Sequence, residues 1–92
     1  MKLAVVGFAS CPYLQRAAQA VAKAAKAGVM EEPVLKIFDT KAEFHHWLDT
    51  DKQHPRDKEP ERSHRTSPFV YDFKTNRFVG GHDDTMALLA KL

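Results

Sequence analysis

The chain has 92 residues, of which 43% are hydrophobic and 28% charged, and its formal net charge is +2 at pH 7. This length predicts one domain over residues 1–92, because so short a chain has too little interior for two cores, and the composition is that of a globular domain. The charge is too small and too mixed in sign to indicate nucleic-acid binding. The single cysteine excludes an intramolecular disulfide framework and favours a reducing compartment, with the cytoplasm as the default.

Residues 2–11 admit a second interpretation as a lipoprotein signal. Lys2 precedes an apolar run, Leu3 to Phe8, that leads through small residues to Cys11. We favour a strand instead, because one lysine is a weak charged segment and the run barely reaches the length of a signal-peptide core. No stretch approaches the roughly 20 apolar residues that cross a bilayer, so no membrane partner is expected.

The first half of the chain has the pattern of a βαβ unit. Leu3 to Phe8 is almost continuously apolar, as in a strand that is covered on both faces at the centre of a sheet. Ser10-Cys11-Pro12 predicts the start of a helix, since proline is accepted in the first helical turn, and the helix extends to about Ala27 before Gly28. A strand over Val34 to Phe38 follows, and this order predicts a parallel pair with a right-handed crossover.

A second helix is predicted after this strand. Asp39 or Thr40 supplies its cap, and the helix ends near Asp49. Its apolar and polar residues fall on opposite sides, with Phe44, Trp47 and Leu48 buried and Lys41, Glu43 and His45 facing water.

The stretch from Asp49 to Arg65 predicts a long charged loop with room for one helical turn. It contains Pro55 and Pro60 and almost no apolar side chain to bury. We therefore expect it to be exposed and more mobile than the elements on either side. Structureless loops longer than about 12 to 15 residues are uncommon in compact domains and are either functional or disordered.

The last third of the chain predicts an antiparallel hairpin and a helix. The strands are Phe69 to Phe73 and Arg77 to Val79, joined by Lys74-Thr75-Asn76. Gly80-Gly81 ends the second strand, and a helix begins at His82-Asp83-Asp84, where acidic residues suit the positive end of the helix dipole. Its core face is expected to hold Met86, Leu88, Leu89 and Leu92. The predicted fold class is α/β, with a four-stranded mixed sheet and helices on both faces.

Cys11 is the main candidate for chemistry. A lone cysteine is more often a small buried hydrophobe than a nucleophile. At the beginning of a helix, however, unpaired backbone N–H groups and the helix dipole favour the thiolate, which is the reactive form. We therefore expect Cys11 to be exposed and reactive.

Two further segments are candidates for ligand binding. Ser67-Pro68 precedes a strand, where a proline alone indicates only the beginning of an edge strand. Gly80-Gly81-His82-Asp83-Asp84 fits a turn with a helix cap, but its glycines also permit a ligand to approach closely and a helix N-terminus binds carboxylates. No metal site is predicted, because the histidines lack metal-ligand spacing, and most of them are expected in water: His45, His46, His54, His64 and His82.

Taken in order, Cys11-Pro12-Tyr13, Thr66-Ser67-Pro68 and Gly80-Gly81-His82-Asp83-Asp84 resemble the motifs of glutaredoxins, which have the thioredoxin-like fold. The resemblance spans nearly the whole chain. It implies that the Pro68 peptide bond is cis, that Cys11 is the catalytic thiol and that Ser67 offers backbone groups to the cysteinyl part of glutathione. It further implies that residues 82 and 83 receive the γ-glutamyl end. The binding residues it implies are Tyr13, Ser67, Pro68, Gly81, His82 and Asp83.

The sequence departs from the glutaredoxin pattern in several places. Leu14 stands where dithiol members have a second cysteine, so only a monothiol route remains. Phe8 stands where a lysine usually attracts the thiolate and the glycine carboxylate of glutathione. The glycine-phenylalanine-serine continuation of the iron–sulfur monothiol class does not follow Cys11, so no iron–sulfur cluster is expected, and the loop from Asp49 to Arg65 is longer than usual.

The resemblance implies a monothiol thiol–disulfide oxidoreductase of low activity. It would act as a monomer on glutathione mixed disulfides, with glutathione as co-substrate and glutathionylated proteins as partners. Two of the departures, together with Trp47-Leu48 and the stretch from Ser63 to Pro68, are also similar to a thioredoxin-like module that precedes some malate-dehydrogenase-like proteins. That similarity implies a non-catalytic interaction or redox-sensing module.

The positions of Arg62, His64 and Arg65 distinguish these two hypotheses. If one of these side chains folds back over the glutathione groove, its positive charge replaces the missing lysine and favours catalysis. If none does, the interaction module is favoured.

Overall fold

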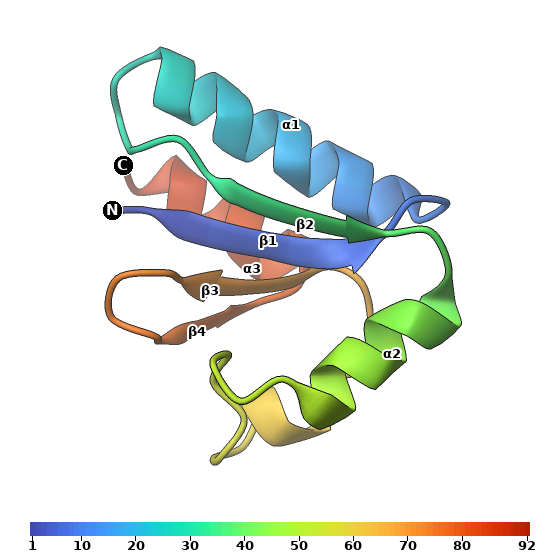
Figure 1. Ribbon diagram of the computed structural model, residues 1–92. Coiled ribbons are helices and arrows are strands. Elements are labelled where there is room, and N and C mark those ends of the chain that lie inside the picture. The colour runs from blue at the N-terminus through green and yellow to red at the C-terminus, as the bar shows by residue number, and fades with distance from the viewer.

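The computed structural model describes residues 1–92 and contains a four-stranded sheet with helices on both sides (Figure 1). The sheet order is β2-β1-β3-β4, in which β1 is parallel to β2, and β3 is antiparallel to both β1 and β4. The predicted α/β class and mixed sheet are therefore confirmed. None of the helices has the length and apolar character that a membrane span requires. The elements are β1 (Leu3–Phe8), α1 (Pro12–Lys26), β2 (Val34–Phe38), α2 (Lys41–Thr50), a 3-10 turn (Glu61–Ser63), β3 (Phe69–Asp72), β4 (Phe78–Gly80) and α3 (His82–Ala90).

β1 is a central strand, as its apolar run predicts. Val5 lies opposite Leu35 of β2 on one side and opposite Val70 of β3 on the other. Successive side chains of a strand point to opposite faces of the sheet, so β1 contributes to two separate cores. Leu3 and Val5 belong to one core cluster, whereas Ala4 and Val6 belong to the other.

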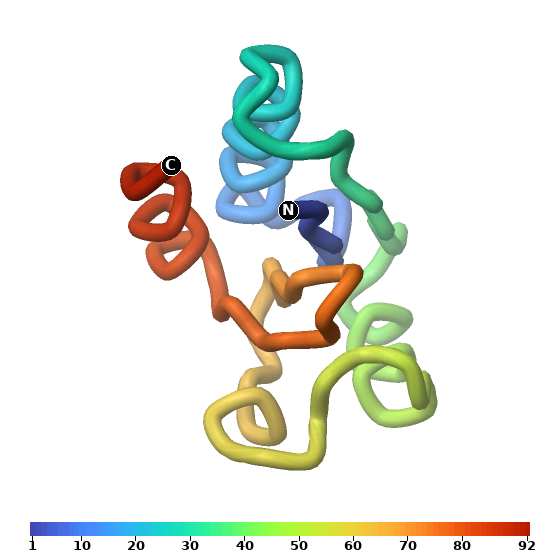
Figure 2. Tube along the Cα trace, turned by 90° about the vertical axis from the view of Figure 1, so that its left-hand side faces the viewer, coloured from blue at the N-terminus to red at the C-terminus, as the bar shows by residue number.

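The helices divide between these two faces (Figures 1 and 2). α1 and α3 cover the face of Leu3 and Val5, and α2 covers the opposite face. Thr40, rather than Asp39, caps α2, since its Oγ1 accepts the backbone N–H of Glu43 at 3.1 Å. The side chains that the helices bury are Leu14, Ala17 and Val21 from α1 and Phe44, Trp47 and Leu48 from α2.

Some predicted details of the last third are wrong. β3 ends at Asp72 and not at Phe73, because the Asp72 carboxylate accepts the backbone N–H of Lys74 at 2.9 Å and turns the chain there. β4 is shifted by one residue, to Phe78–Gly80. Leu92 is 49% exposed because α3 has already ended, so it is not part of the core.

The segment after α2 was expected to be an exposed loop, and most of its residues are exposed, but it is anchored in the core at two buried residues. His54 is only 3% exposed, and Pro55 is also buried. The His54 ring stacks on Trp47 with 4.3 Å between centroids and meets the edge of Phe69 at 5.2 Å. Asp51 Oδ2 accepts hydrogen bonds from the backbone N–H and from Nδ1 of His54, both at 2.9 Å. The segment has almost no aliphatic residue to bury, so the His54 ring takes that role and packs against Trp47 and Phe69.

The Asp51–His54 contact predicts an acid-sensitive anchor. Burial raises the pKa of the Asp51 carboxyl, but its hydrogen bonds with His54 and Gln53 outweigh burial, so the net shift is downward. A carboxyl with a lowered pKa contributes stability above its ordinary pKa, and that contribution disappears as pH falls through the folded value. Asp51→Asn should lower the free energy of unfolding by about 1–2 kcal/mol at neutral pH, and this difference should shrink in acid.

Urea unfolding of both proteins across the acid range measures this difference. Asp57→Asn is the control, because Asp57 is exposed and its carboxylate makes no hydrogen bond. A stability difference for Asp51→Asn that stays constant with pH would contradict the assigned role of this carboxylate.

Candidate functional site

Cys11 is held where β1 passes into α1. It is the N-cap residue of α1, and its carbonyl accepts the N–H of Gln15 at 3.3 Å. Its own N–H donates to the carbonyl of Phe8 at 3.1 Å. Pro12 follows it, no side chain caps the helix, and the first turn holds no acidic residue. The positive end of the helix dipole is therefore free of a competing charge beside the thiol.

The expectation of an exposed thiol is wrong. Cys11 is 7% exposed and belongs to the core cluster under α1, together with Leu14. Its thiol donates a hydrogen bond to the Ser67 carbonyl at 3.5 Å. Cys11 also lines a surface cavity, so its small exposed part faces that space.

Ser67 connects the thiol to the end of β1. The Ser67–Pro68 peptide bond is cis, and the segment lies across the groove from Cys11. The Ser67 hydroxyl accepts the backbone N–H of Phe8 at 3.4 Å. These contacts join the end of β1 and the start of α1 to the chain before β3, which lies 56 to 59 residues further along the sequence.

Gly7 makes this close approach possible. A Cβ at position 7 would lie 2.1 Å from Ser67 Oγ and 2.9 Å from Leu14 Cδ1, both shorter than any ordinary contact. Gly7 was not among the residues expected from the sequence. The available signal was a glycine inside an otherwise apolar strand, which often marks a close approach of another part of the chain.

One cavity, of about 440 Å³, extends from Ser67 to the start of α3. Tyr13 forms one side of it and is 53% exposed, and its ring meets the edge of the His82 ring at 5.5 Å. His82 Nδ1 lies 2.9 Å from a carboxylate oxygen of Asp83. Five of the six expected binding residues line this cavity, whereas Pro68 is buried. The lining residues are Tyr13, His64, Thr66, Ser67, Gly81, His82, Asp83 and Asp84.

A second cavity, of about 490 Å³, is lined in part by Cys11. It contains three basic side chains, which come from α2 and from the segment before β3. Thr66 and Ser67 line both cavities, so the cavity that Cys11 lines adjoins the first one at these two residues. The second cavity is lined by Phe8, Cys11, Lys41, His45, Arg65, Thr66 and Ser67.

Two contacts hold Arg65 at this cavity. Its guanidinium donates to both carboxylate oxygens of Asp49, at 2.7 and 3.3 Å, and its carbonyl lies 2.9 Å from His45 Nε2. The hydrogen bond with Asp49 raises the pKa of Arg65, and the same bond lowers the pKa of the Asp49 carboxyl. Asp49 offsets part of the Arg65 charge, which leaves Lys41 as a cation without an ion pair.

The three candidates for replacing the missing lysine lie at different places in the structure. Arg65 lines the cavity that contains Cys11, and His64 lines the other cavity. Arg62 points elsewhere and donates to the backbone carbonyl of Asp57 at 2.9 Å.

Lys41 and His45 were expected to face water, and their place beside the thiol was not foreseen from the sequence. Both line the cavity that contains Cys11. The available signal was their spacing of four residues, which places both side chains on one face of α2.

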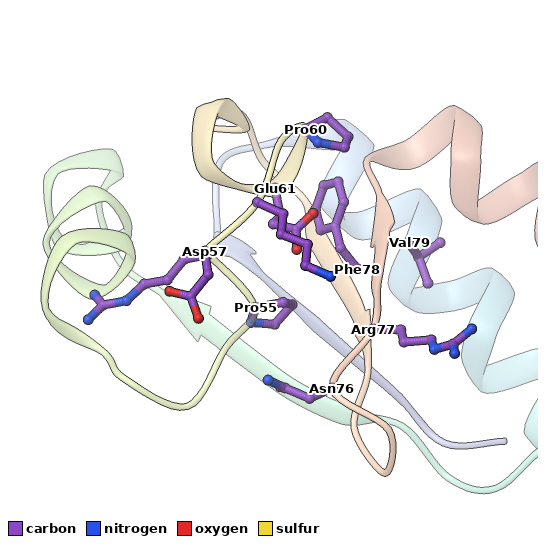
Figure 3. A pocket seen from close by; sticks show the side chains of 10 residues that line it. Pro55, Asp57, Pro60, Glu61, Asn76, Arg77, Phe78 and Val79 are labelled. Carbon is purple, nitrogen blue, oxygen red and sulfur yellow. The ribbon is translucent and has the colours of Figure 1, made fainter.

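Another cavity, of about 470 Å³, lies away from the thiol, between residues 55–61 and the β3–β4 hairpin (Figure 3). Asp57, Glu61 and Arg77 give it mixed charge, and Phe78 contributes an aromatic wall. It contains none of the residues around Cys11 and is not part of the candidate site. No group of three or more histidine, cysteine, aspartate or glutamate side chains comes together as a set of metal ligands.

The contact between Gly7 and Ser67 predicts a specific pattern of destabilisation. Gly7→Ala should lower the free energy of unfolding by about 1–3 kcal/mol, because the added methyl group overlaps Ser67 Oγ. Ser67→Gly in the same chain should recover part of that loss, since neighbouring residues that clash are coupled. Chemical denaturation of the single and double variants measures the recovery.

Gly28→Ala is the matched control. Gly28 has φ +78°, and a Cβ at this position would meet no atom within 4 Å, so the cost of the methyl group comes from the backbone and Ser67→Gly cannot relieve it. If Ser67→Gly restores the same share of stability to Gly7→Ala and to Gly28→Ala, or restores none to either, the assigned contact between Gly7 and Ser67 is wrong.

Comparisons with known proteins bear on the fold. No model of a known protein family matches the chain, and no curated protein matches it. A solved structure, glutaredoxin 1 from Francisella tularensis complexed with cacodylate, matches over 98% of this chain and 93% of its own length, with a TM-score of 0.59 and 16% sequence identity. The chain therefore has the thioredoxin-like α/β fold of that glutaredoxin.

Proposed function

We propose that this protein is a monothiol thiol–disulfide oxidoreductase that acts on glutathione mixed disulfides through Cys11. Glutathione is the co-substrate and glutathionylated proteins are the substrates. The observation that carries the proposal is the place of Cys11, at the beginning of a helix and on a cavity that shares Thr66 and Ser67 with the cavity toward α3. The lone thiol suits the reducing cytoplasm, where glutathione keeps cysteines reduced.

The two cavities match the two ends of glutathione. Glutathione has a central thiol, a carboxylate on its glycine end, and both a carboxylate and an ammonium group on its γ-glutamyl end. Lys41 and Arg65 suit the glycine carboxylate, because charge-assisted hydrogen bonds to carboxylates are stronger than neutral ones. His45 lies against the Arg65 carbonyl and helps to hold that residue at the cavity. The beginning of α3, at Gly81 and His82, offers backbone N–H groups to the γ-glutamyl carboxylate.

The remaining expected residues complete this arrangement. The Asp83 side chain is 99% exposed and can meet the γ-glutamyl ammonium group. Ser67 and Pro68 lie opposite the thiol, where backbone groups of residue 67 can pair with the cysteinyl part. Tyr13 forms the outer wall of the same groove.

The reaction needs one protein thiol and two glutathione sulfurs. The Cys11 thiolate attacks the glutathione sulfur of the mixed disulfide, so a Cys11–glutathione bond forms while the bond to the substrate protein breaks, and the released thiolate takes up a proton. A second glutathione thiolate then attacks the glutathione sulfur of the Cys11 adduct. Oxidised glutathione leaves, and the Cys11 thiolate is restored. Leu14 offers no second thiol, so this second glutathione is required.

A non-catalytic redox-sensing or interaction module is the second candidate. It is favoured by the burial of Cys11, which is 7% exposed, and by Asp49, which offsets part of the positive charge of Arg65. In such a module the thiol would accept glutathione and keep it.

Turnover separates the two candidates. In an assay that couples oxidised glutathione to glutathione reductase, we expect slow reduction of a small glutathione mixed disulfide, and Cys11→Ser should abolish it. If the unchanged protein forms a stable adduct without turnover, the redox-sensing candidate replaces the enzyme. If it forms no adduct, both the enzyme and the sensor are wrong.

The basic cavity should control the affinity for glutathione. Lys41→Ala and Arg65→Ala should each raise the KM for glutathione by about three- to tenfold, which corresponds to the roughly 1 kcal/mol of one partly solvated charged contact. Phe8→Lys should lower the KM and speed turnover, because Phe8 lines the same cavity and a cation there also favours the thiolate. Steady-state kinetics at low and moderate salt measures these changes, since salt weakens exposed charge pairs.

Arg62→Ala is the matched control, because Arg62 carries the same charge three residues away but lines neither cavity. If it raises the KM as much as Arg65→Ala does, the effect comes from net charge and the assignment of this cavity to the glycine carboxylate is wrong.

A further inference from the structure

We propose that His64 is a positioning residue that sets the width of the cavity between Ser67 and α3. It does so by tying the Thr66–Pro68 turn to the beginning of α3. The role of this cavity in glutathione binding rests on the proposed function, whereas the tie itself is a property of the chain.

The first half of the tie is a hydrogen bond. His64 Nε2 lies 3.0 Å from the carbonyl oxygen of Pro68. A carbonyl oxygen only accepts hydrogen bonds, so Nε2 carries the proton and donates. The hydroxyl oxygen of Thr66 lies 3.3 Å from the same nitrogen. One imidazole N–H thus faces acceptors on both sides of Ser67, the residue whose carbonyl meets the Cys11 thiol.

The second half of the tie is packing. The His64 ring meets Phe69 of β3 and Phe78 of β4, with centroid distances of 5.6 and 5.2 Å and interplanar angles of 71° and 64°. A Cβ at position 81 would lie 3.2 Å from Cε1 of the ring. Gly81 is the N-cap residue of α3, so the ring fits directly against the chain where that helix begins. Its position is fixed by both strands of the hairpin.

These contacts place His64 between the two walls of the 440 Å³ cavity. Thr66 and Ser67 form one wall, and Gly81 and His82 form the other. An extended tripeptide must pair with both walls at once, so the spacing of the walls decides its affinity. The Cys11 backbone, in contrast, is held by α1 and by β1, and the thiol has one hydrogen bond to the tied turn, at the Ser67 carbonyl 3.5 Å away. Loss of the tie should therefore weaken glutathione binding far more than it changes the intrinsic reactivity of Cys11.

His64→Gln and His64→Met form a matched pair for the test. Both side chains are similar in length and both remove the ring, but only glutamine keeps an N–H donor for the Pro68 carbonyl. The probes are oxidised glutathione, which needs both walls, and iodoacetamide, which needs neither. In the glutathione reaction, the Cys11 thiolate displaces one glutathione thiolate and forms a mixed disulfide with the other half.

The expected result is a split between the two probes. His64→Met should slow glutathionylation of Cys11 by about tenfold at low concentrations of oxidised glutathione and approach the unchanged rate at high concentrations. His64→Gln should recover most of that loss, and alkylation should stay within twofold in both variants. Equal slowing of both probes, or no slowing of either, would overturn the positioning role. His46→Gln is the control, since His46 lines neither cavity.

Amide hydrogen exchange tests the tie without glutathione. The reporters are the amides of Phe8 and Thr85, which donate to Ser67 Oγ at 3.4 Å and to the Gly81 carbonyl at 3.0 Å. His64→Met should speed exchange at both by at least tenfold relative to the central amides of β1, and His64→Gln should do so much less. Unchanged exchange at both residues would overturn the proposal. If the unchanged protein forms no glutathione adduct, the proposed function fails, and the exchange data still decide whether His64 holds the two walls together.

Discussion

The Cys11 thiol lies 3.5 Å from the Ser67 carbonyl. The candidate site depends on this close approach of the segment before β3 to the start of α1. Ser67 comes so near because position 7 has no side chain: a Cβ there would lie 2.1 Å from Ser67 Oγ. The Ser67 hydroxyl, which occupies this gap, accepts the N–H of Phe8 and fixes the segment to the end of β1. With that segment in place, Thr66 and Ser67 line two adjoining cavities, and Cys11 lines one of them.

Basic side chains gather at the cavity that Cys11 lines, although Phe8 stands where glutaredoxins usually have a lysine. Lys41 and His45 come from the beginning of α2, and Arg65 comes from the segment before β3. This arrangement differs from a single lysine beside the thiol, because Asp49 pairs with Arg65 and the aromatic ring of Phe8 lines the same cavity.

The main elements could be predicted from the sequence because each is determined locally. The apolar run of β1, the proline after Cys11 and the 3.6-residue spacing of α1 each need only neighbouring residues, and the boundaries of β1 and β2 are confirmed. The expected binding residues Tyr13, Ser67 and His82 came from their resemblance to known motifs, and the structure brings them to one cavity.

What the sequence did not predict depends on contacts between distant residues. Cys11 is buried in part by Ser67, 56 residues further along the chain. His54 is buried between Trp47 and Phe69, and a histidine is expected in water unless such aromatic partners are known. Lys41 looked like an ordinary surface residue of a helix, because only the fold shows that this helix begins beside the thiol. The role of Gly7 likewise becomes visible only when Ser67 is placed next to it.

We infer that Cys11 accepts glutathione in the groove between the start of α1 and Ser67-Pro68, and the mass of the intact protein measures this reaction. After incubation with oxidised glutathione, we expect a gain of a single glutathione per chain, located on the peptide that contains Cys11 and removed by excess reduced glutathione. If the two cavities bind the charged ends of glutathione, the adduct forms faster than with an uncharged disulfide of similar size. An unmodified mass, or equal rates with both disulfides, would show that the groove does not recognise glutathione.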